Sequence, residues 1–227
     1  MKLSAVRFAV LLAFVACFSA GEASANTITV NNPSFEILPG GGLPSGCGPA
    51  CSYDAGATPG WNGGSGQFQP GPPATTAYFL SVPDGATVGY VGGAGNTPFT
   101  QTVGVTVVDG VTYTLTVDLG TRVDTGFGSA ADLVIGGSTL IAATGTPAAA
   151  GDWATYTATF TGTSLTAGQS IGIELSSIGS QADFDNVQLS DNVSSNIASA
   201  VPEPSSISLL ALGLTGLAGV ARRKFRS

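Results

Sequence analysis

The chain has 227 residues and no histidine, and its 7 basic residues are outnumbered by 14 acidic ones. The absence of histidine excludes Ser-His and Cys-His catalytic pairs and His-based zinc sites. Six of the basic residues lie near the ends of the chain, so residues 26–200 contain Arg122 alone against twelve acidic residues, a net charge of −11. Phosphate contacts need Lys and Arg, which argues against nucleic-acid binding.

Residues 1–25 have the pattern of an export signal peptide. Lys2 and Arg7 precede an apolar stretch over 8–18, and small residues follow just before Asn26. This order predicts signal-peptidase cleavage between Ala25 and Asn26. Lipoprotein processing at Cys17 is the alternative, but the residues before Cys17 match a lipidation motif poorly.

The body, residues 26–190, is predicted to be all-β. Residues 112–119 place Tyr113, Leu115, Val117 and Leu119 on one face and threonine or aspartate on the other. Such strict alternation is typical of a half-buried strand, and the body shows no helical apolar period. About ten short strands then have to bury their faces against each other, which favours a jelly-roll β-sandwich. The predicted strands are 27–30, 77–82, 87–91, 99–107, 112–119, 132–136, 139–143, 155–161, 170–176 and 181–190.

Within the body, residues 39–75 are rich in glycine and proline and lack strand patterning. The segment is too long for an ordinary connection, so it is predicted to be a long surface loop, and such loops often carry function. It contains Cys47 and Cys51, and an even number of cysteines in an exported protein predicts a disulfide. A bridge over so few residues should act locally. A metal site is disfavoured because no second cysteine pair accompanies this one.

After a linker over 191–200, the chain ends in three consecutive signals over 201–227. Pro202, Glu203 and Pro204 come first, an apolar segment over 207–221 follows, and a basic cluster over 222–226 closes the chain. Together they resemble the PEP-CTERM sorting signal, which exosortase recognises.

The PEP-CTERM resemblance implies that the precursor is exported across the inner membrane and held there by transient insertion of a transmembrane helix over 207–221. Exosortase and the export machinery would be its partners, and the processed protein would reach the cell surface or the extracellular space. A permanent membrane anchor is the alternative. However, 15 residues of helix span only about 22 Å, against a hydrocarbon core of about 30 Å.

The body also contains landmarks in a recognisable order. They resemble the galactose-binding-like jelly-roll modules, which include many carbohydrate-binding modules. That resemblance implies a structural calcium ion joining the first and last strands, with Glu36 and Asp185 as the matching ligands; carboxylates and carbonyls are the oxygen ligands that calcium needs. No other cofactor is implied. The landmarks are Asn31-Asn32-Pro33-Ser34-Phe35-Glu36, Pro59-Gly60-Trp61, Gln101-Thr102-Val103, Tyr113-Thr114-Leu115, Trp153-Ala154-Thr155-Tyr156 and Phe184-Asp185-Asn186-Val187.

Aromatic side chains in or beside loops are the candidates for a sugar-stacking platform. Trp61 and Trp153 match structural positions of the family and are expected to pack inside the domain. Arg122, flanked by Asp118 and Asp124, is expected to be the centre of a salt bridge and not a catalytic group. The candidate platform residues are Tyr53, Phe68, Tyr78 and Phe127.

Two functions remain open. In the first, the body is a non-catalytic carbohydrate-binding module that holds exopolysaccharide at the cell surface or in a biofilm. In the second, it is a structural matrix protein without a specific ligand. A glycoside-active enzyme would need only two carboxylates. The available aspartates lie where a sandwich exposes strand ends and turns, so no enzymatic activity is expected; these aspartates are Asp118, Asp124, Asp132 and Asp152.

Overall fold

A computed structural model describes residues 25–48, 51–71 and 78–193. These residues form fourteen strands and no helix, so the all-β prediction is confirmed for them. The signal peptide and the sorting tail with its apolar segment 207–221 lie outside the described residues. No helix in the described part of the chain is long and apolar enough to cross a membrane.

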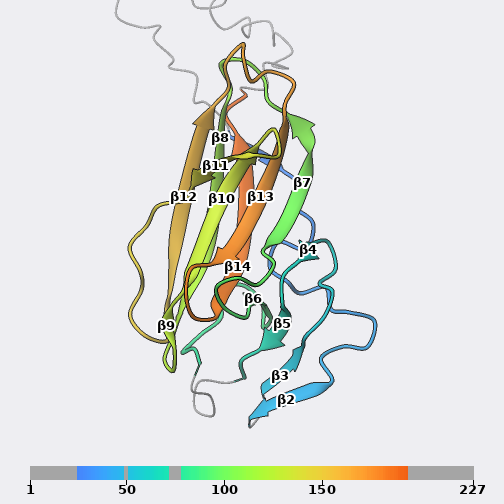
Figure 1. Ribbon diagram of the computed structural model, residues 1–227, viewed down its shortest axis with the longest axis vertical. Coiled ribbons are helices and arrows are strands. Elements are labelled where there is room, and N and C mark those ends of the chain that lie inside the picture. Colours follow the sequence, from blue (N-terminus) through green and yellow to red (C-terminus); the bar gives the residue numbers. More distant parts are fainter. Residues whose placement is uncertain (1–24, 49–50, 72–77, 194–227) are drawn as a thin grey trace, which may run out of the picture.

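The strands form two sheets that pack as a sandwich (Figure 1). The larger sheet has the order β12-β8-β14-β6-β5-β3-β2, with β1 paired to β14 and β9 to β8, and the smaller has the order β11-β10-β13-β7-β4. The bounds of the strands are β1 Asn26–Ile28, β2 Ser45–Gly48, β3 Cys51–Asp54, β4 Asn62–Gly63, β5 Gly66–Gln69, β6 Val88–Val91, β7 Phe99–Thr106, β8 Thr112–Arg122, β9 Gly126–Phe127, β10 Ser129–Ile135, β11 Thr139–Ala142, β12 Trp153–Thr161, β13 Ser170–Ser177 and β14 Ala182–Asp191.

Two predictions about the first half of the body are wrong. Residues 39–75 are not a strand-free loop, because they contain β2, β3, β4 and β5, of which β2, β3 and β5 extend the larger sheet. These strands have at most four residues and contain several glycines, so they show too little alternation to be found by pattern. Residues 78–82 of the predicted strand 77–82 form no strand.

The main core lies between the two sheets and follows the predicted alternation. Tyr113, Leu115, Val117 and Leu119 of β8 are all at most 2 % exposed. They meet inward-facing residues of β10 and β13, such as Leu133 and Ile173. Burying one such side chain stabilises the fold by about 1.5–3 kcal/mol. Trp61 belongs to this core, stacked on Phe35 with ring centroids 5.6 Å apart, which confirms its structural role.

A second, smaller cluster of apolar residues lies on the β3, β5 and β6 part of the larger sheet. Its buried members are Cys51, Phe68, Phe79 and Val88, and partly buried rings pack against them. Trp153 is one of these rings, 4.5 Å from Phe79, and its indole N–H donates to the Ser81 carbonyl at 2.9 Å. We call this group the aromatic cluster. Its partly buried members are Cys47, Tyr53, Tyr78, Val82, Tyr90 and Trp153.

The two termini of the body lie at one end of the sandwich. Asn26 pairs with Asp191, and Asp191 pairs with Tyr113 next to the start of β8. We call this the tail end. At the opposite end, β8 finishes at Arg122 and β14 begins at Ala182, beside the aromatic cluster. β2, β3 and β9 lie at that opposite end in Figure 1.

Candidate ligand pocket

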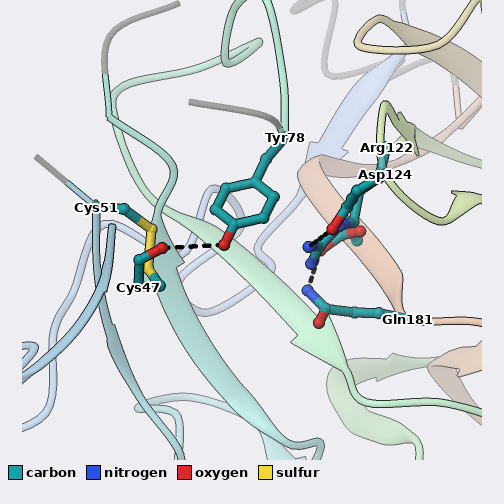
Figure 2. Close-up of a disulfide and its surroundings, with 7 residues drawn as sticks. Cys47, Cys51, Tyr78, Arg122, Asp124 and Gln181 are labelled. Carbon is teal, nitrogen blue, oxygen red and sulfur yellow. Dashed lines mark hydrogen bonds and ion pairs between the residues drawn. A yellow bond between two sulfur atoms is a disulfide. The ribbon is translucent and has the colours of Figure 1, made fainter. Parts of the chain in front are cut away.

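The predicted disulfide is confirmed: Cys47 and Cys51 are bonded across the β2–β3 hairpin, with their Cα atoms 5.1 Å apart. The bridge lies over the aromatic cluster, in which Cys51 is buried. The Tyr78 hydroxyl donates to the Cys47 carbonyl at 3.0 Å, as Figure 2 shows. The hairpin and Tyr78 are thereby fixed to each other, although they are about thirty residues apart in the chain.

A pocket of about 180 Å³ opens on the aromatic cluster. Its walls come from five strands of the larger sheet, β2, β3, β5, β6 and β8, from the segment between β5 and β6, and from Gln181 just before β14. Three tyrosines and one phenylalanine supply ring surface, and an arginine and a glutamine supply hydrogen-bond donors. The lining residues are Cys47, Tyr53, Phe68, Tyr78, Tyr90, Arg122 and Gln181.

The rings of the pocket pack edge to face. Phe68 lies at the centre, with Tyr78 at a centroid distance of 6.0 Å and an interplanar angle of 88°, and Tyr90 at 5.8 Å and 83°. Aromatic pairs favour this geometry because the positive edge of one ring meets the negative face of the other. Phe68 is only 4 % exposed, so it forms the floor of the pocket, and the tyrosines offer their surfaces above it.

Arg122 is held in the pocket wall by two kinds of interaction. Its Nε and Nη2 donate to the two carboxylate oxygens of Asp124 at 2.8 and 2.7 Å, and its guanidinium lies 4.3 Å from the centroid of the Tyr78 ring. Burial lowers the pKa of Arg122, but the hydrogen bonds to Asp124, together with the nearby Asp183, Asp124 and Tyr78 groups, outweigh this and raise it. The same hydrogen bonds lower the pKa of Asp124. Arg122 is therefore a salt-bridge centre, as predicted, but with Asp124 only. Asp118 accepts hydrogen bonds from Thr155 and Asn186 instead.

Asp183 is a buried carboxyl group next to the pocket. It is fully buried on β14, where it pairs across strands with Tyr90. One oxygen accepts a hydrogen bond from Gln181 at 2.8 Å, and the other has no hydrogen-bond partner among the described residues. Burial raises the pKa of Asp183 to about 7. The group is thus able to take up or release a proton near neutral pH, which is the range that suits an acid-base catalyst.

The structure brings three of the four predicted platform residues together in the pocket. Tyr53, Phe68 and Tyr78 all line it, although Phe68 is buried and not exposed as expected. Phe127 does not lie there: it stacks on Tyr156 with centroids 5.6 Å apart and packs against the main core. The sequence-based prediction for Phe127 rested on its loop position alone, which gave no information about its neighbours.

Four residues in or beside the pocket were not predicted as ligand residues, namely Tyr90, Arg122, Gln181 and Asp183. Asp183 carried one usable signal. It lies in Ala182-Asp183-Phe184-Asp185, where two acidic residues alternate with apolar ones in the buried first part of the strand. Charged residues are almost never fully buried without a partner, so such an interruption indicates a special role.

Glu36 and Asp185, the predicted calcium ligands, both contact the loop over 84–87. One Glu36 oxygen accepts the amides of Ala86 and Thr87 at 2.7 and 2.6 Å, and Asp185 accepts the Asp84 amide at 2.9 Å. Burial raises the pKa of Asp185 to about 8, and repulsion from Asp84 and Asp118 adds to the rise. The hydrogen bonds from the backbone amides of Asp84 and Asn186 act in the opposite direction but are outweighed. Within the described residues no three His, Cys, Asp or Glu side chains gather around a possible metal position. A calcium ion would therefore need backbone carbonyls for most of its ligands, and its presence stays a prediction.

The aspartates considered for glycoside cleavage are dispersed. Asp118 and Asp152 line one open groove together with Trp153, whereas Asp132 lies on the smaller sheet. Asp124 forms an ion pair with Arg122. The pocket on the aromatic cluster brings four aromatic rings together with an arginine and a glutamine, and we take it as the candidate site.

Known proteins match both the tail and the body of the chain. Residues 200–226 match the PEP-CTERM protein-sorting motif, which confirms the predicted sorting signal and marks an exported protein with a membrane-anchored precursor. Residues 26–190 match the family model of HpiC1 cyclase. No curated protein sequence matches the chain significantly.

Solved structures of cyclases from Fischerella sp. TAU resemble the body. One Stig cyclase, in complex with (3Z)-3-(1-methyl-2-pyrrolidinylidene)-3H-indole, is 28 % identical, covers 74 % of this chain and 98 % of its own, and has a TM-score of 0.59. Another, in complex with 4-(1H-indol-3-yl)butan-2-one, is 26 % identical with the same coverage and a TM-score of 0.58.

Carbohydrate-binding modules are also among the similar structures. The xylan-binding CBM22-1 domain of Paenibacillus barcinonensis is 12 % identical and covers 73 % of this chain and 94 % of its own, with a TM-score of 0.41 that is too low to support an argument about function. The match to the family model spans nearly the whole sandwich. The body of this chain therefore belongs to the HpiC1-like cyclase family.

Proposed function

We propose that this protein is an exported, non-catalytic binding protein whose pocket holds one sugar ring of an extracellular polysaccharide. The observation that supports this most is the convergence of Tyr53 and Tyr78 with Arg122 and Gln181 around a single cavity. Aromatic surface and a few fixed polar groups are the usual composition of a ligand site. At about 180 Å³ the cavity is smaller than a typical site for drug-sized ligands, which favours one ring or a chain end.

The charge of the pocket favours an uncharged sugar. Arg122 is already neutralised by Asp124, and the body around it carries twelve acidic residues. A field of this sign repels anionic polymers. The guanidinium and the Gln181 amide would then act as hydrogen-bond donors to hydroxyl groups, with a tyrosine ring against the apolar face of the sugar.

The sorting motif bears on where such binding would take place. A protein that is exported and sorted at the membrane would present its pocket to polymers at the cell surface or in a biofilm matrix, and exopolysaccharide is the expected partner. The alternative, a structural matrix protein without a ligand, needs no pocket at all. It would be supported by a folded protein that binds no glycan.

The test is a glycan array that includes the exopolymer of the host, probed with the exported protein carrying its disulfide. Tyr53→Ala and Gln181→Ala should each weaken binding about tenfold or more, a loss of about 1.4 kcal/mol. Phe127→Ala is the matched control, because Phe127 is an aromatic residue outside the pocket. If all three variants bind like the parent protein, the pocket is not the glycan site.

A second candidate function is acid-assisted cyclisation of a small indole-type compound. Asp183 favours it, because its buried carboxyl has a pKa raised to about 7 and an oxygen without a described partner. The family membership and the indole ligands of the two Fischerella cyclases point in the same direction. In this reading, Asp183 donates a proton to the substrate and takes one back after ring closure, so that no net proton is consumed.

An indole compound and two variants distinguish the two candidate functions. 4-(1H-indol-3-yl)butan-2-one should not compete with a bound glycan if the pocket is a sugar site. Saturable binding of this indole compound that Tyr53→Ala abolishes, together with turnover of an indole substrate that Asp183→Asn abolishes, would establish the second function.

A further inference from the structure

The chain leaves for the sorting tail at one end of the sandwich, and the pocket lies at the other end. β8 has eleven residues and runs from Thr112 at the tail end to Arg122 in the pocket wall. At about 3.3 Å per residue, these two residues are about 33 Å apart. β14, with ten residues, runs in the opposite direction beside β8 and finishes at Asp191, from which the chain continues to the sorting tail. The pocket and the point of attachment therefore lie at opposite ends of the domain.

Few residues connect the domain to the predicted membrane segment. Thirteen residues separate Val193 from Ile207, the first residue of the predicted membrane segment. Even when fully extended, thirteen residues reach no farther than about 45 Å. While the sorting tail holds the precursor in the membrane, the tail end of the sandwich stays within reach of the bilayer surface.

The tail end presents apolar side chains in that direction. Val108 and Leu165, in the loops between β7 and β8 and between β12 and β13, are 52 % and 89 % exposed, and Val193 is 38 % exposed. The two loops are hydrogen-bonded to each other, for example from the Gly110 amide to the Gly162 carbonyl at 3.0 Å. They lie at the same end of the sandwich, as the green and orange loops at the top of Figure 1.

Leu165 is held outward by a tight turn. Thr166 Oγ1 accepts the Thr163 amide at 2.9 Å, and the Ala167 amide donates to the Thr163 carbonyl at 2.9 Å. Side-chain hydroxyls that bond to nearby backbone groups stabilise such turns. The backbone of this loop is already ordered, so contact between Leu165 and a surface does not have to order it.

From this geometry we infer that the tail end, with Val108 and Leu165 at its tip, lies against the lipid bilayer while the sorting tail holds the precursor, so that the aromatic pocket faces away from the membrane. Exposed apolar side chains also occur at the pocket end, where Val123 is 51 % exposed. The short attachment decides between the two ends, because it raises the effective concentration of the bilayer at the tail end only. This arrangement depends on the sorting motif and not on what the pocket binds.

The experiment uses the full-length precursor reconstituted in phosphatidylcholine vesicles that contain a lipid with a shallow nitroxide quencher. One variant, Leu165→Cys, carries a polar fluorophore at the tail end, and the matched variant Thr125→Cys carries the same fluorophore at an exposed turn of the pocket end. We expect quenching at position 165 to exceed that at position 125 by at least about twofold. Equal quenching at both positions, stronger quenching at 125, or none at either would overturn the inference.

A second reporter separates contact from mere proximity. The fluorophore is moved to the exposed Ala167 as Ala167→Cys, with and without Leu165→Ser. If Leu165 contacts the lipid, Leu165→Ser should lower the quenching at position 167. Unchanged quenching would show that the tether alone, and not this side chain, sets the distance.

Discussion

The main core and the aromatic cluster are built on different principles. The main core joins both sheets and consists largely of aliphatic side chains from β8, β10 and β13 that are almost completely buried. The aromatic cluster lies on one sheet, is made of rings and a disulfide, and encloses Arg122 and Asp183. The first mainly stabilises the fold, because its side chains are almost all apolar and the polar atoms of Trp61 and Tyr113 are bonded to backbone groups. The second places charged groups in a low-dielectric environment, which is what a binding or catalytic site requires.

The largest effect is expected in the main core. Leu133→Ala should lower the free energy of unfolding by about 2–5 kcal/mol, because Leu133 is completely buried and the cavity cannot fill with water. Phe68→Leu in the aromatic cluster should cost about 1 kcal/mol, since volume is largely kept. Urea denaturation measures both. A larger loss for Phe68→Leu than for Leu133→Ala would break the distinction between the two clusters.

The pH dependence of stability should come from the aromatic cluster. Because the pKa of Asp183 is raised from 3.8 to about 7, the folded protein binds a proton that the unfolded chain releases between these values. The free energy of unfolding therefore falls as pH rises from about 4 to about 8, by an amount on the order of 3 kcal/mol for this group.

Asp183→Asn should flatten this slope and be more stable than the parent protein at about pH 8. Asp109→Asn, at an exposed carboxylate, is the control and should keep the slope. The residual slope in Asp183→Asn should come from Asp185, whose pKa is also raised. Identical pH profiles for Asp183→Asn and the parent protein would contradict the burial of a titrating group beside the pocket.

Calcium should act at the boundary between the two clusters. The segment with Glu36 and the loop over 84–87 contact each other just before β6, whose Val88 and Val91 belong to the aromatic cluster and the main core respectively. If calcium binds there, an excess of about one hundred times its Kd should raise the free energy of unfolding by about 2.7 kcal/mol. Glu36→Gln should remove the effect. A melting temperature that is the same in calcium and in excess chelator would argue against the ion.

A local effect is expected from the disulfide. Replacing Cys47 and Cys51 together by serine should cost about 2 kcal/mol or less, because the bridge closes a very short loop. The loss should be confined to the aromatic cluster, so near-ultraviolet circular dichroism of the tyrosines should change while amide protection in β10 and β13 stays the same. Loss of protection throughout the sandwich would show that the hairpin supports the whole fold.

The strands of the main core could be predicted from sequence because each has a long alternating pattern. β8, β12 and β13 are predicted in this way, because apolar and polar residues alternate over 112–119, 155–161 and 170–176. The strands β2 to β5 could not be found, because their glycines and their length of two to four residues leave no period to detect.

The pocket was predicted only in part, for a related reason. Tyr53, Phe68 and Tyr78 were candidates because they are aromatic residues near loops, but Phe127 met the same criterion and lies elsewhere. The raised pKa of Asp183 depends on how many atoms surround it after folding. That quantity arises from residues distant in the chain, and no local pattern contains it.

The position of β14 also sets the order of events during export. β14 is the last strand of the described residues, yet it lies between β8 and β6 and also pairs with β1. The larger sheet cannot close until β14 has crossed the membrane, and closing it brings together residues that are far apart in sequence, which is slow. The sorting motif begins only nine residues after Asp191. The sorting tail therefore reaches the membrane before the sheet has closed, and until it closes the unpaired strand edges are exposed to aggregation.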